Sequence, residues 1–162
     1  MQDVNSAFFD FLIKAESVEP FVYPDSNNLP TIGIGHLLTL SELTSGKIYI
    51  AGEPVQYANG LSREHIDRLC RQDAMEAIKA VNSYVTVKLT QNQFNALVSL
   101  AFNIGISAFK NSTLVRRLNL GAYSAVPLEM RRWIRSGGMV VQGLINRREA
   151  EIKLWNSIEE YS

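Results

Sequence analysis

Two acidic residues and a threonine near the N-terminus have the types and spacing that could cleave a glycosidic bond. Glu16, Asp25 and Thr31 read as E-x8-D-x5-T. A rigid helix end and an adjacent hairpin can bring two carboxyl groups to opposite sides of a bound chain. Glycosidic cleavage needs one protonated acid for the leaving oxygen and one ionised group for water or positive charge. The spacing alone is weak evidence, because acids near helix ends and in turns are often structural.

The stretch LPTIGIGH, residues 29–36, surrounds this threonine with alternating apolar residues and glycines. The alternation is typical of a strand, anchored by Ile32 and Ile34, and it fixes the direction in which Thr31 points. Glycines inside a strand usually mark a bulge or a close approach of the backbone by another group. We therefore expect Gly33 and Gly35 to let a second molecule lie against this segment.

The elements that must position these residues begin with a short amphipathic helix. Asn5 or Ser6 can cap it, and it should end before Pro20, which disfavours a helix at the preceding residue. Residues 21–60 change to short strand-like runs separated by Asp, Ser, Asn, Pro and Gly. This alternation of short strand-like runs and turn residues predicts a small β lobe.

The rest of the chain has helical periodicity. Ser62 should cap a long amphipathic helix, and Thr90 with Gln93 forms a capping box before a nearly continuous apolar run that predicts a fully buried helix. Cys70 lies in the long helix, where a small buried thiol is the expected state. Further helices are predicted over 112–119, 123–134 and 144–158, with a loop or short hairpin over 136–143.

Length and composition limit the class of protein. At 162 residues the chain can form one domain with a sizeable core, and it contains no apolar run as long as a membrane span. Asp3 and Asp10 lie where a secretory signal would have basic residues, so we expect no export signal. Through Thr90 there are 7 basic and 11 acidic residues, and 9 and 5 after it. The basic part of the chain after Thr90 could bind an anionic polymer, or its charges could simply form a solvated face.

Three blocks in order resemble the bacteriophage-type lysozymes, glycoside hydrolase family 24. They are E16…Y23-P-D25…P30-TIGIGH36, LTQNQFNALVSLAFNIG at 89–105 and GLINRREAEIKLW at 143–155, and they span most of the chain. The resemblance implies an α+β, two-lobed lysozyme-like fold in one domain, residues 1–162. A small antiparallel β lobe, about 17–60, would be joined by a long helix to a larger helical lobe, about 61–162 plus the N-terminal helix.

The same resemblance implies a muramidase that hydrolyses the β-1,4 bond between N-acetylmuramic acid and N-acetylglucosamine, with no metal or organic cofactor. Glu16 matches the general acid, Asp25 the second acidic residue and Thr31 its hydroxyl partner. Thr31 would hold a water against Asp25, and the route would invert the sugar. Glu16 must be protonated to act, which partial desolvation would favour.

Three further residues match supporting positions of the family. His36 would form a structural ion pair with Asp73. Arg147 would lie near Glu16 and orient it, or would be a surface arginine of the last helix. Arg148 is expected on the surface.

Substrate contacts implied by the resemblance come from both lobes. Phe102 is equally plausible as a core residue. Asn103 lies where the buried helix opens to solvent, so a hydrogen bond to an acetamido group is reasonable. The implied substrate-binding residues are Gly35, Leu37, Phe102, Asn103 and Ser112.

The chain departs from the family in several places. Ser17 and Glu19 stand where glycine and a basic residue are common, and the balanced net charge predicts weak steering towards an anionic wall. Residues 40–60 lengthen the β lobe and could add a hairpin.

Three hypotheses stay open: an active muramidase, a non-hydrolytic peptidoglycan-binding or structural module, and a lytic transglycosylase. The expected partner is the peptidoglycan glycan strand, with no nucleic acid and no stable membrane association. We expect a monomer in the host cytoplasm before release to the cell wall by a holin or similar route, or a virion-associated protein.

Overall fold

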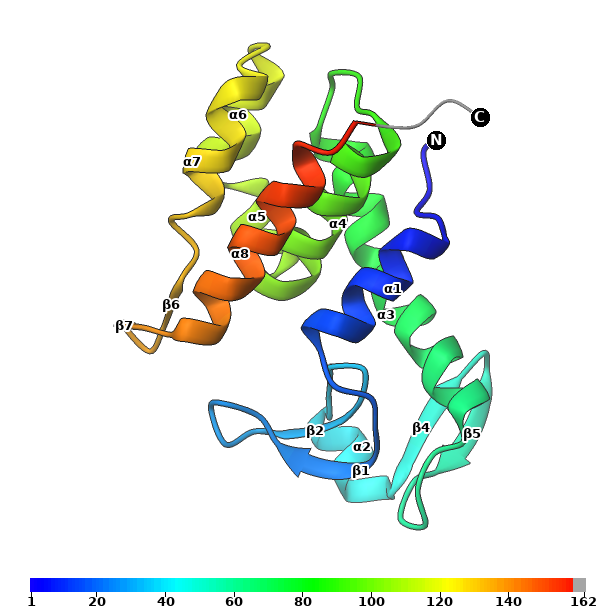
Figure 1. Cartoon of the computed structure of the whole chain (residues 1–162). Coiled ribbons are helices and arrows are strands. Elements are labelled where there is room, and N and C mark those ends of the chain that lie inside the picture. Colours follow the sequence, from blue (N-terminus) through cyan, green and yellow to red (C-terminus); the bar gives the residue numbers. More distant parts are fainter. Residues whose placement is uncertain (159–162) are drawn as a thin grey trace. The chain divides into compact units, whose positions relative to one another are not determined.

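A computed structural model describes residues 1–158, which form two units of mixed helix and antiparallel strand (Figure 1). One unit is Asp10–Met75, and the other joins Met1–Phe9 to the chain from Glu76 onward. The predicted α+β class is confirmed. The single domain over 1–162 stays a prediction, and its last four residues lie outside the described residues. No helix within residues 1–158 combines the length and apolar character needed to cross a bilayer.

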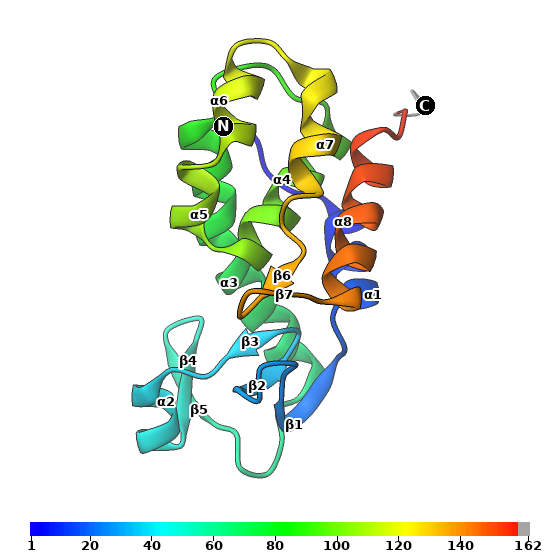
Figure 2. The same cartoon turned by 90° about the vertical axis from the view of Figure 1, so that its left-hand side faces the viewer.

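The Asp10–Met75 unit is built on a three-stranded antiparallel sheet in the order β1-β2-β3, with a separate two-stranded hairpin, β4-β5 (Figure 2). The N-terminal helix ends well before Pro20, as predicted, and the hydroxyl of Ser62 caps the long helix by accepting from the N–H of His65 at 3.1 Å. The elements of this unit are β1 (Glu19–Pro24), β2 (Pro30–Gly33), β3 (His36–Leu37), α2 (Leu40–Ser45), β4 (Lys47–Ile50), β5 (Glu53–Gln56) and parts of α1 (Ser6–Ala15) and α3 (Arg63–Tyr84).

The predicted single strand over TIGIGH is wrong. β2 ends at Gly33 and β3 begins at His36, because Gly33 and Gly35 adopt φ of 70° and 67° and reverse the chain. Left-handed backbone of this kind favours glycine, which has no Cβ to clash with the carbonyl oxygen. Ile32 and Ile34 are buried, as expected of anchoring residues.

Helix α2 was not predicted, although the hairpin that follows it, β4-β5, was. The helix has a complete capping box, in which Thr39 accepts from the N–H of Glu42 and Glu42 accepts from the N–H of Thr39. Gly46 ends it in left-handed conformation. The helix has six residues, none of them buried, and its two leucines are too few to show a helical period in the sequence.

The other unit is helical. α4 (Gln91–Ile104) has the predicted Thr90–Gln93 capping box and buries every residue from 94 to 101, and α8 (Gln142–Trp155) packs on it. The predicted hairpin is present as β6 and β7. The remaining elements are α5 (Ile106–Lys110), which was not predicted, α6 (Thr113–Asn119), η1 (Tyr123–Ala125), α7 (Val126–Met130), β6 (Arg135–Ser136) and β7 (Met139–Val140).

The helix predicted over 123–134 is shorter than expected. A 3-10 turn, η1, leads into α7, which ends at Met130. Pro127 lies in the first turn of α7, where a proline is tolerated because its missing N–H has no intrahelical partner to lose. It therefore begins the helix instead of interrupting a longer one.

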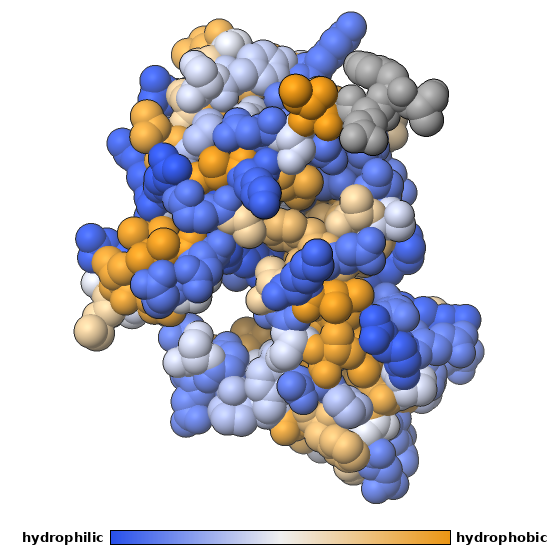
Figure 3. Space-filling view, viewed as in Figure 1, coloured by the Kyte–Doolittle hydropathy of each residue, from blue (hydrophilic) through white to orange (hydrophobic). Residues whose placement is uncertain are grey.

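Most buried side chains are apolar, although some polar side chains are also buried and some large apolar ones are exposed. Cys70 is buried as predicted, and burial raises the pKa of its thiol to about 12. The face in Figure 3 is largely hydrophilic, with separate hydrophobic patches. Such isolated apolar exposure is normal for a folded protein.

Candidate functional site

Glu16 follows the last residue of α1 and is half-buried within the Asp10–Met75 unit. Its N–H donates to the carbonyl of Leu12 at 2.7 Å, which continues the helical geometry by one residue. Its carboxyl group lies against Gly35: a Cβ on Gly35 would be 2.9 Å from Cδ of Glu16. The close approach predicted at this glycine is therefore made, in the structure, by the proposed acid itself.

Asp25 is held by the loop between β1 and β2. Its Oδ1 accepts from the N–H groups of Asn27 and Leu29, each at 2.8 Å. The backbone also closes the loop, since the N–H of Asp25 donates to the carbonyl of Leu29 at 2.9 Å. These bonds fix the carboxylate by one oxygen. Asp25 is half-exposed and, within residues 1–158, its Oδ2 accepts no hydrogen bond, so this oxygen can accept from a water.

Thr31 lies on β2, opposite Tyr23 of β1, and is buried. Its hydroxyl donates to the carbonyl of Leu29 at 2.9 Å. Leu29 therefore links the two predicted catalytic residues, because its N–H donates to Asp25 and its carbonyl accepts from Thr31. With its proton engaged, the hydroxyl of Thr31 is left as an acceptor for a water.

Tyr23 belongs to this group, although it was not selected from the sequence. Burial raises the pKa of its hydroxyl, a hydrogen bond from Ser17 lowers it, and the carboxylates of Glu16, Glu19 and Asp25 raise it again, so the net shift is upward. The phenol thus feels the charge of both predicted catalytic acids. The sequence feature that could have identified Tyr23 is its position two residues before Asp25, within the motif Y23-P-D25.

His36 lies between two carboxylates. Its Nδ1 is 2.7 Å from Oδ2 of Asp73, which is the predicted contact, and its Nε2 is 3.0 Å from Oε1 of Glu42, which was not predicted. Burial lowers the pKa of His36, but the hydrogen bonds and charges of Asp73 and Glu42 raise it more, so the net shift is upward. For Glu42, burial raises the pKa, and the hydrogen bonds from Thr39 and His36 more than reverse this.

In the helical unit, Arg147 and Arg148 are both buried on α8. The expectation that Arg148 is a surface residue is wrong: its side chain has 0% exposure, and its Nε lies 2.7 Å from Oε1 of Glu151. Nη2 of Arg147 donates to the carbonyl and hydroxyl of Ser99 on α4, and its Nε is 3.5 Å from Oε2 of Glu151. Burial lowers the pKa of Arg148, against the charge of Glu151.

The predicted substrate-binding residues fall into two groups. Leu37 is half-exposed on β3, in the same unit as Gly35. In the helical unit, Phe102 and Asn103 are partly exposed near the end of α4, and Ser112 is buried as the N-cap of α6, accepting from the N–H of Val115. Their contact with substrate stays a prediction.

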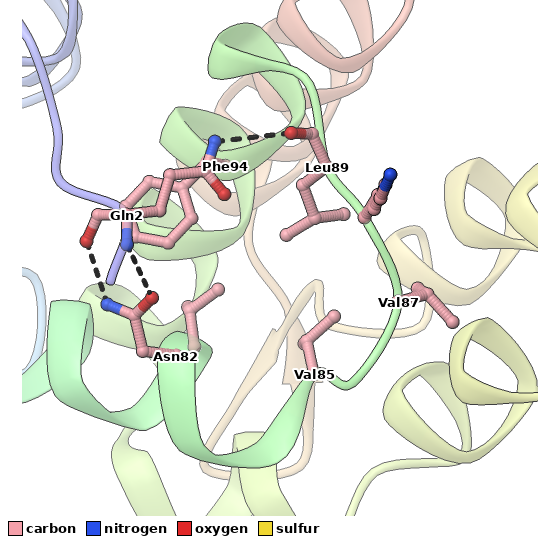
Figure 4. Close-up of a pocket in the computed structure, with 8 residues that line it drawn as sticks. Gln2, Asn82, Val85, Val87, Leu89 and Phe94 are labelled. Carbon is pink, nitrogen blue, oxygen red and sulfur yellow. Dashed lines mark hydrogen bonds between the residues drawn. The ribbon is translucent and has the colours of Figure 1, made fainter.

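A pocket of about 290 Å³ in the helical unit contains none of the predicted site residues (Figure 4). Gln2 and Asn82 exchange two hydrogen bonds at its rim, and the side chain of Gln2 also donates to the carbonyl of Leu89. The wall is completed mainly by apolar residues. The lining residues are Gln2, Val81, Asn82, Val85, Val87, Lys88, Leu89 and Phe94.

The side chains of the Asp10–Met75 unit include the groups that acid–base hydrolysis of a glycosidic bond requires. It presents one carboxyl group against a glycine, a second held by backbone N–H groups, and a buried threonine hydroxyl next to the loop of the second. Within residues 1–158, no three His, Cys, Asp or Glu side chains are grouped so as to hold a metal ion.

Comparison with known proteins gives the following similarities. Residues 13–151 match the family described as Phage lysozyme. The endolysin of Bacillus phage PZA is 38% identical over 127 residues, covering 78% of this chain and 44% of that protein. The endolysin of Salmonella phage P22 is 36% identical over 137 residues, covering 85% and 87%. The chain spans less than half the length of the two Bacillus phage endolysins that it matches.

Two solved structures are similar over nearly the whole chain. The muramidase domain of SpmX from Asticaccaulis excentricus has a TM-score of 0.78 at 30% identity, covering 98% of this chain and 100% of that one. The endolysin from Escherichia coli O157:H7 phage FAHEc1 has a TM-score of 0.79 at 31% identity, covering 96% and 94%.

Proposed function

Because the chain belongs to the phage lysozyme family, we propose that it is a muramidase that hydrolyses the β-1,4 bond between N-acetylmuramic acid and N-acetylglucosamine in peptidoglycan. The observation that carries this proposal is the arrangement in the Asp10–Met75 unit. Glu16 lies against Gly35, and the peptide groups of Leu29 hold both Asp25 and Thr31. The names of the relatives, endolysin and muramidase domain, agree with it.

The proposed mechanism uses the two carboxyl groups in different protonation states. Protonated Glu16 gives its proton to the glycosidic oxygen as the bond from that oxygen to the anomeric carbon breaks. Ionised Asp25 takes a proton from a water, whose oxygen bonds to the anomeric carbon from the opposite face. Thr31 orients that water as an acceptor, because its own proton is engaged by Leu29. The product has inverted configuration.

We propose that the protein acts without a cofactor, as a monomer whose partner is the glycan strand, and that both units belong to one lysozyme-like domain. It would reach the cell wall from the host cytoplasm by a holin-dependent or similar route, or within a virion. The names endolysin and SAR-endolysin among its relatives support release towards the wall.

The test is digestion of purified peptidoglycan, with the products identified by mass spectrometry. We expect the parent to release hydrated reducing ends, and Glu16→Gln to release none while it still folds, because the amide has no acidic proton to give. Glu19→Gln is the matched control, since it removes a nearby half-buried acid that has no role in the mechanism.

The rival hypotheses give different products. Anhydro sugar ends would make the protein a transglycosylase. Binding to peptidoglycan without any product, equal in the parent and in Glu16→Gln, would make it a non-hydrolytic module.

A further inference from the structure

Arg148 is fully buried yet bonds to three different segments of the helical unit. Its Nη1 donates to the carbonyl of Trp133 at 3.1 Å, and its Nη2 donates to Oδ1 of Asn103 at 2.7 Å and to Oε2 of Glu151 at 3.2 Å. Its Nε forms an ion pair with Oε1 of Glu151 at 2.7 Å. The planar guanidinium presents its N–H groups in a fixed fork, so three acceptors in different directions hold it in one orientation.

The bond to Arg148 determines which way the amide of Asn103 faces. The two ends of an asparagine amide are similar in size, but a guanidinium has only donors, so the carbonyl oxygen must point at it. The NH₂ group then points away from Arg148. Asn103 is partly exposed, and within residues 1–158 its Nδ2 donates to no other group.

We propose that Arg148 is a positioning residue, which holds Asn103 so that its NH₂ group donates to the carbonyl of a substrate acetamido group. This inference rests on the proposed function. N-acetyl groups occur on both sugars of the glycan strand, and their carbonyl oxygens accept hydrogen bonds. An asparagine free to rotate would present oxygen or nitrogen about equally, whereas one fixed by Arg148 presents the donor alone.

Glu151 fixes Arg148 in turn. The carboxylate lies fully buried and accepts from the hydroxyl of Ser99 at 2.6 Å, as well as from Arg148 at Nη2, 3.2 Å away. Ser99 and Asn103 both lie on α4, four residues apart and therefore on one face of the helix. The network thus ties α8 to the side of α4 that bears Asn103.

The sharpest variant is Asn103→Asp. An aspartate keeps the acceptor for Arg148 and has the same shape, so the fold should be retained with a thermal midpoint at least equal to that of the parent. It replaces the outward donor by an oxygen. We expect KM for soluble, uncross-linked peptidoglycan strands to rise about tenfold or more, with kcat changed much less. Asn156→Asp, an exposed site on the same unit, is the control for the added charge and should leave KM unchanged.

Arg148→Lys tests the positioning residue itself. Lysine keeps the positive charge beside Glu151, but one ammonium group cannot serve Glu151, Trp133 and Asn103 together. We expect KM to rise in the parent background and to change little in the Asn103→Asp background, where the outward donor is already lost. A structural role alone would give the same change in both backgrounds, in step with the fall in thermal midpoint.

Three results would overturn the inference while leaving the proposed function intact. They are a parental KM for Asn103→Asp, a raised KM that returns to the parental value at high ionic strength, and equal effects of Arg148→Lys in the two backgrounds. The second would indicate charge repulsion, which salt screens, instead of a lost donor. A parent that releases no sugar ends would refute the proposed function, and this inference with it.

Discussion

At the scale of single residues, the close approach of Glu16 to Gly35 limits which residue can stand at position 35. Gly35 serves two needs at once. It has a φ of 67°, and it leaves room for a carboxyl group that lies where its Cβ would be. The first need concerns stability and the second concerns activity, so the two can be measured separately.

We predict that Gly35→Ala loses far more activity than stability. Positive φ costs an alanine about 1 kcal/mol of folding free energy, measured by urea unfolding. The clash falls on the flexible end of Glu16, which can move away cheaply but is then misplaced, so kcat should fall about 100-fold.

The matched control is Gly52→Ala, which has a φ of 82° and open space around the added Cβ. It should lose similar stability and retain its kcat. Equal losses of kcat in the two variants would show that the contact with Glu16 has no catalytic consequence.

At the scale of elements, charged side chains join segments that are distant in the sequence. His36 of β3 contacts Asp73 of α3 and Glu42 of α2, and Glu42 also completes the capping box of α2. Glu151 of α8 contacts Ser99 of α4 and Arg148 of its own helix. The first group is partly exposed, whereas the second is buried.

The His36 contacts predict a pH window of stability. The raised pKa of His36 means that its stabilising effect is complete below the unfolded value, 6.5, and is lost as pH rises through the folded pKa. The lowered pKa of Glu42 means that its effect is complete above 4.5 and is lost as pH falls through its folded pKa.

The advantage of the parent over His36→Gln in urea unfolding should therefore be greatest between pH 4.5 and 6.5, at about 1–3 kcal/mol, and should shrink on either side. His65→Gln, which also removes one imidazole, is the control. A difference between parent and His36→Gln that stays constant from pH 4 to pH 8, roughly the span over which these groups titrate, would contradict the ion pairs.

The buried network predicts a large effect for Glu151→Ala. Removing this carboxylate leaves Arg148 in a buried site without its counter-charge, which should destabilise the protein by about 3–5 kcal/mol in urea unfolding. Glu149→Ala is the matched control on the same helix, because Glu149 pairs with Arg131 on the surface, where both side chains are 49% exposed. It should cost less than about 1 kcal/mol. Similar losses in the two variants would refute the importance of burial.

At the scale of the whole molecule, charge is balanced in total but not within each unit. The Asp10–Met75 unit has five Lys and Arg against nine Asp and Glu, and the remainder of the chain has eleven against seven. The formal net charge is +0. The chain therefore offers no net charge to attract an anionic polymer, and salt at physiological ionic strength screens exposed charges beyond about 8 Å.

We therefore predict that kcat/KM on peptidoglycan changes by no more than about threefold when ionic strength is raised from about 0.01 M to 0.15 M. The comparison is the double variant Glu64→Lys and Glu76→Lys, which adds positive charge at two exposed sites of α3. It should be more active at low ionic strength and should lose that gain as salt is added. A steep salt dependence in the parent would show that local charge, not net charge, governs encounter with the wall.

The sequence by itself determined the class of fold, the long and the buried helices, the family resemblance and the position of Glu16, Asp25 and Thr31. These follow from patterns within short stretches: apolar periodicity, the capping box at Thr90, and motif spacing. The turn within TIGIGH was missed, because alternation in a sequence does not report the sign of φ at Gly33 and Gly35.

Only the tertiary structure decided which charged residues are buried and what each one contacts. Arginine is a residue type that usually lies on the surface. Arg148 is buried because α8 packs on α4, where Asn103 accepts from Arg148 and Ser99 donates to Glu151. Glu42 meets His36 through a turn and a short helix that no periodicity marked. Such contacts join residues from separate elements, and their energy depends on burial and distance, neither of which a local pattern contains.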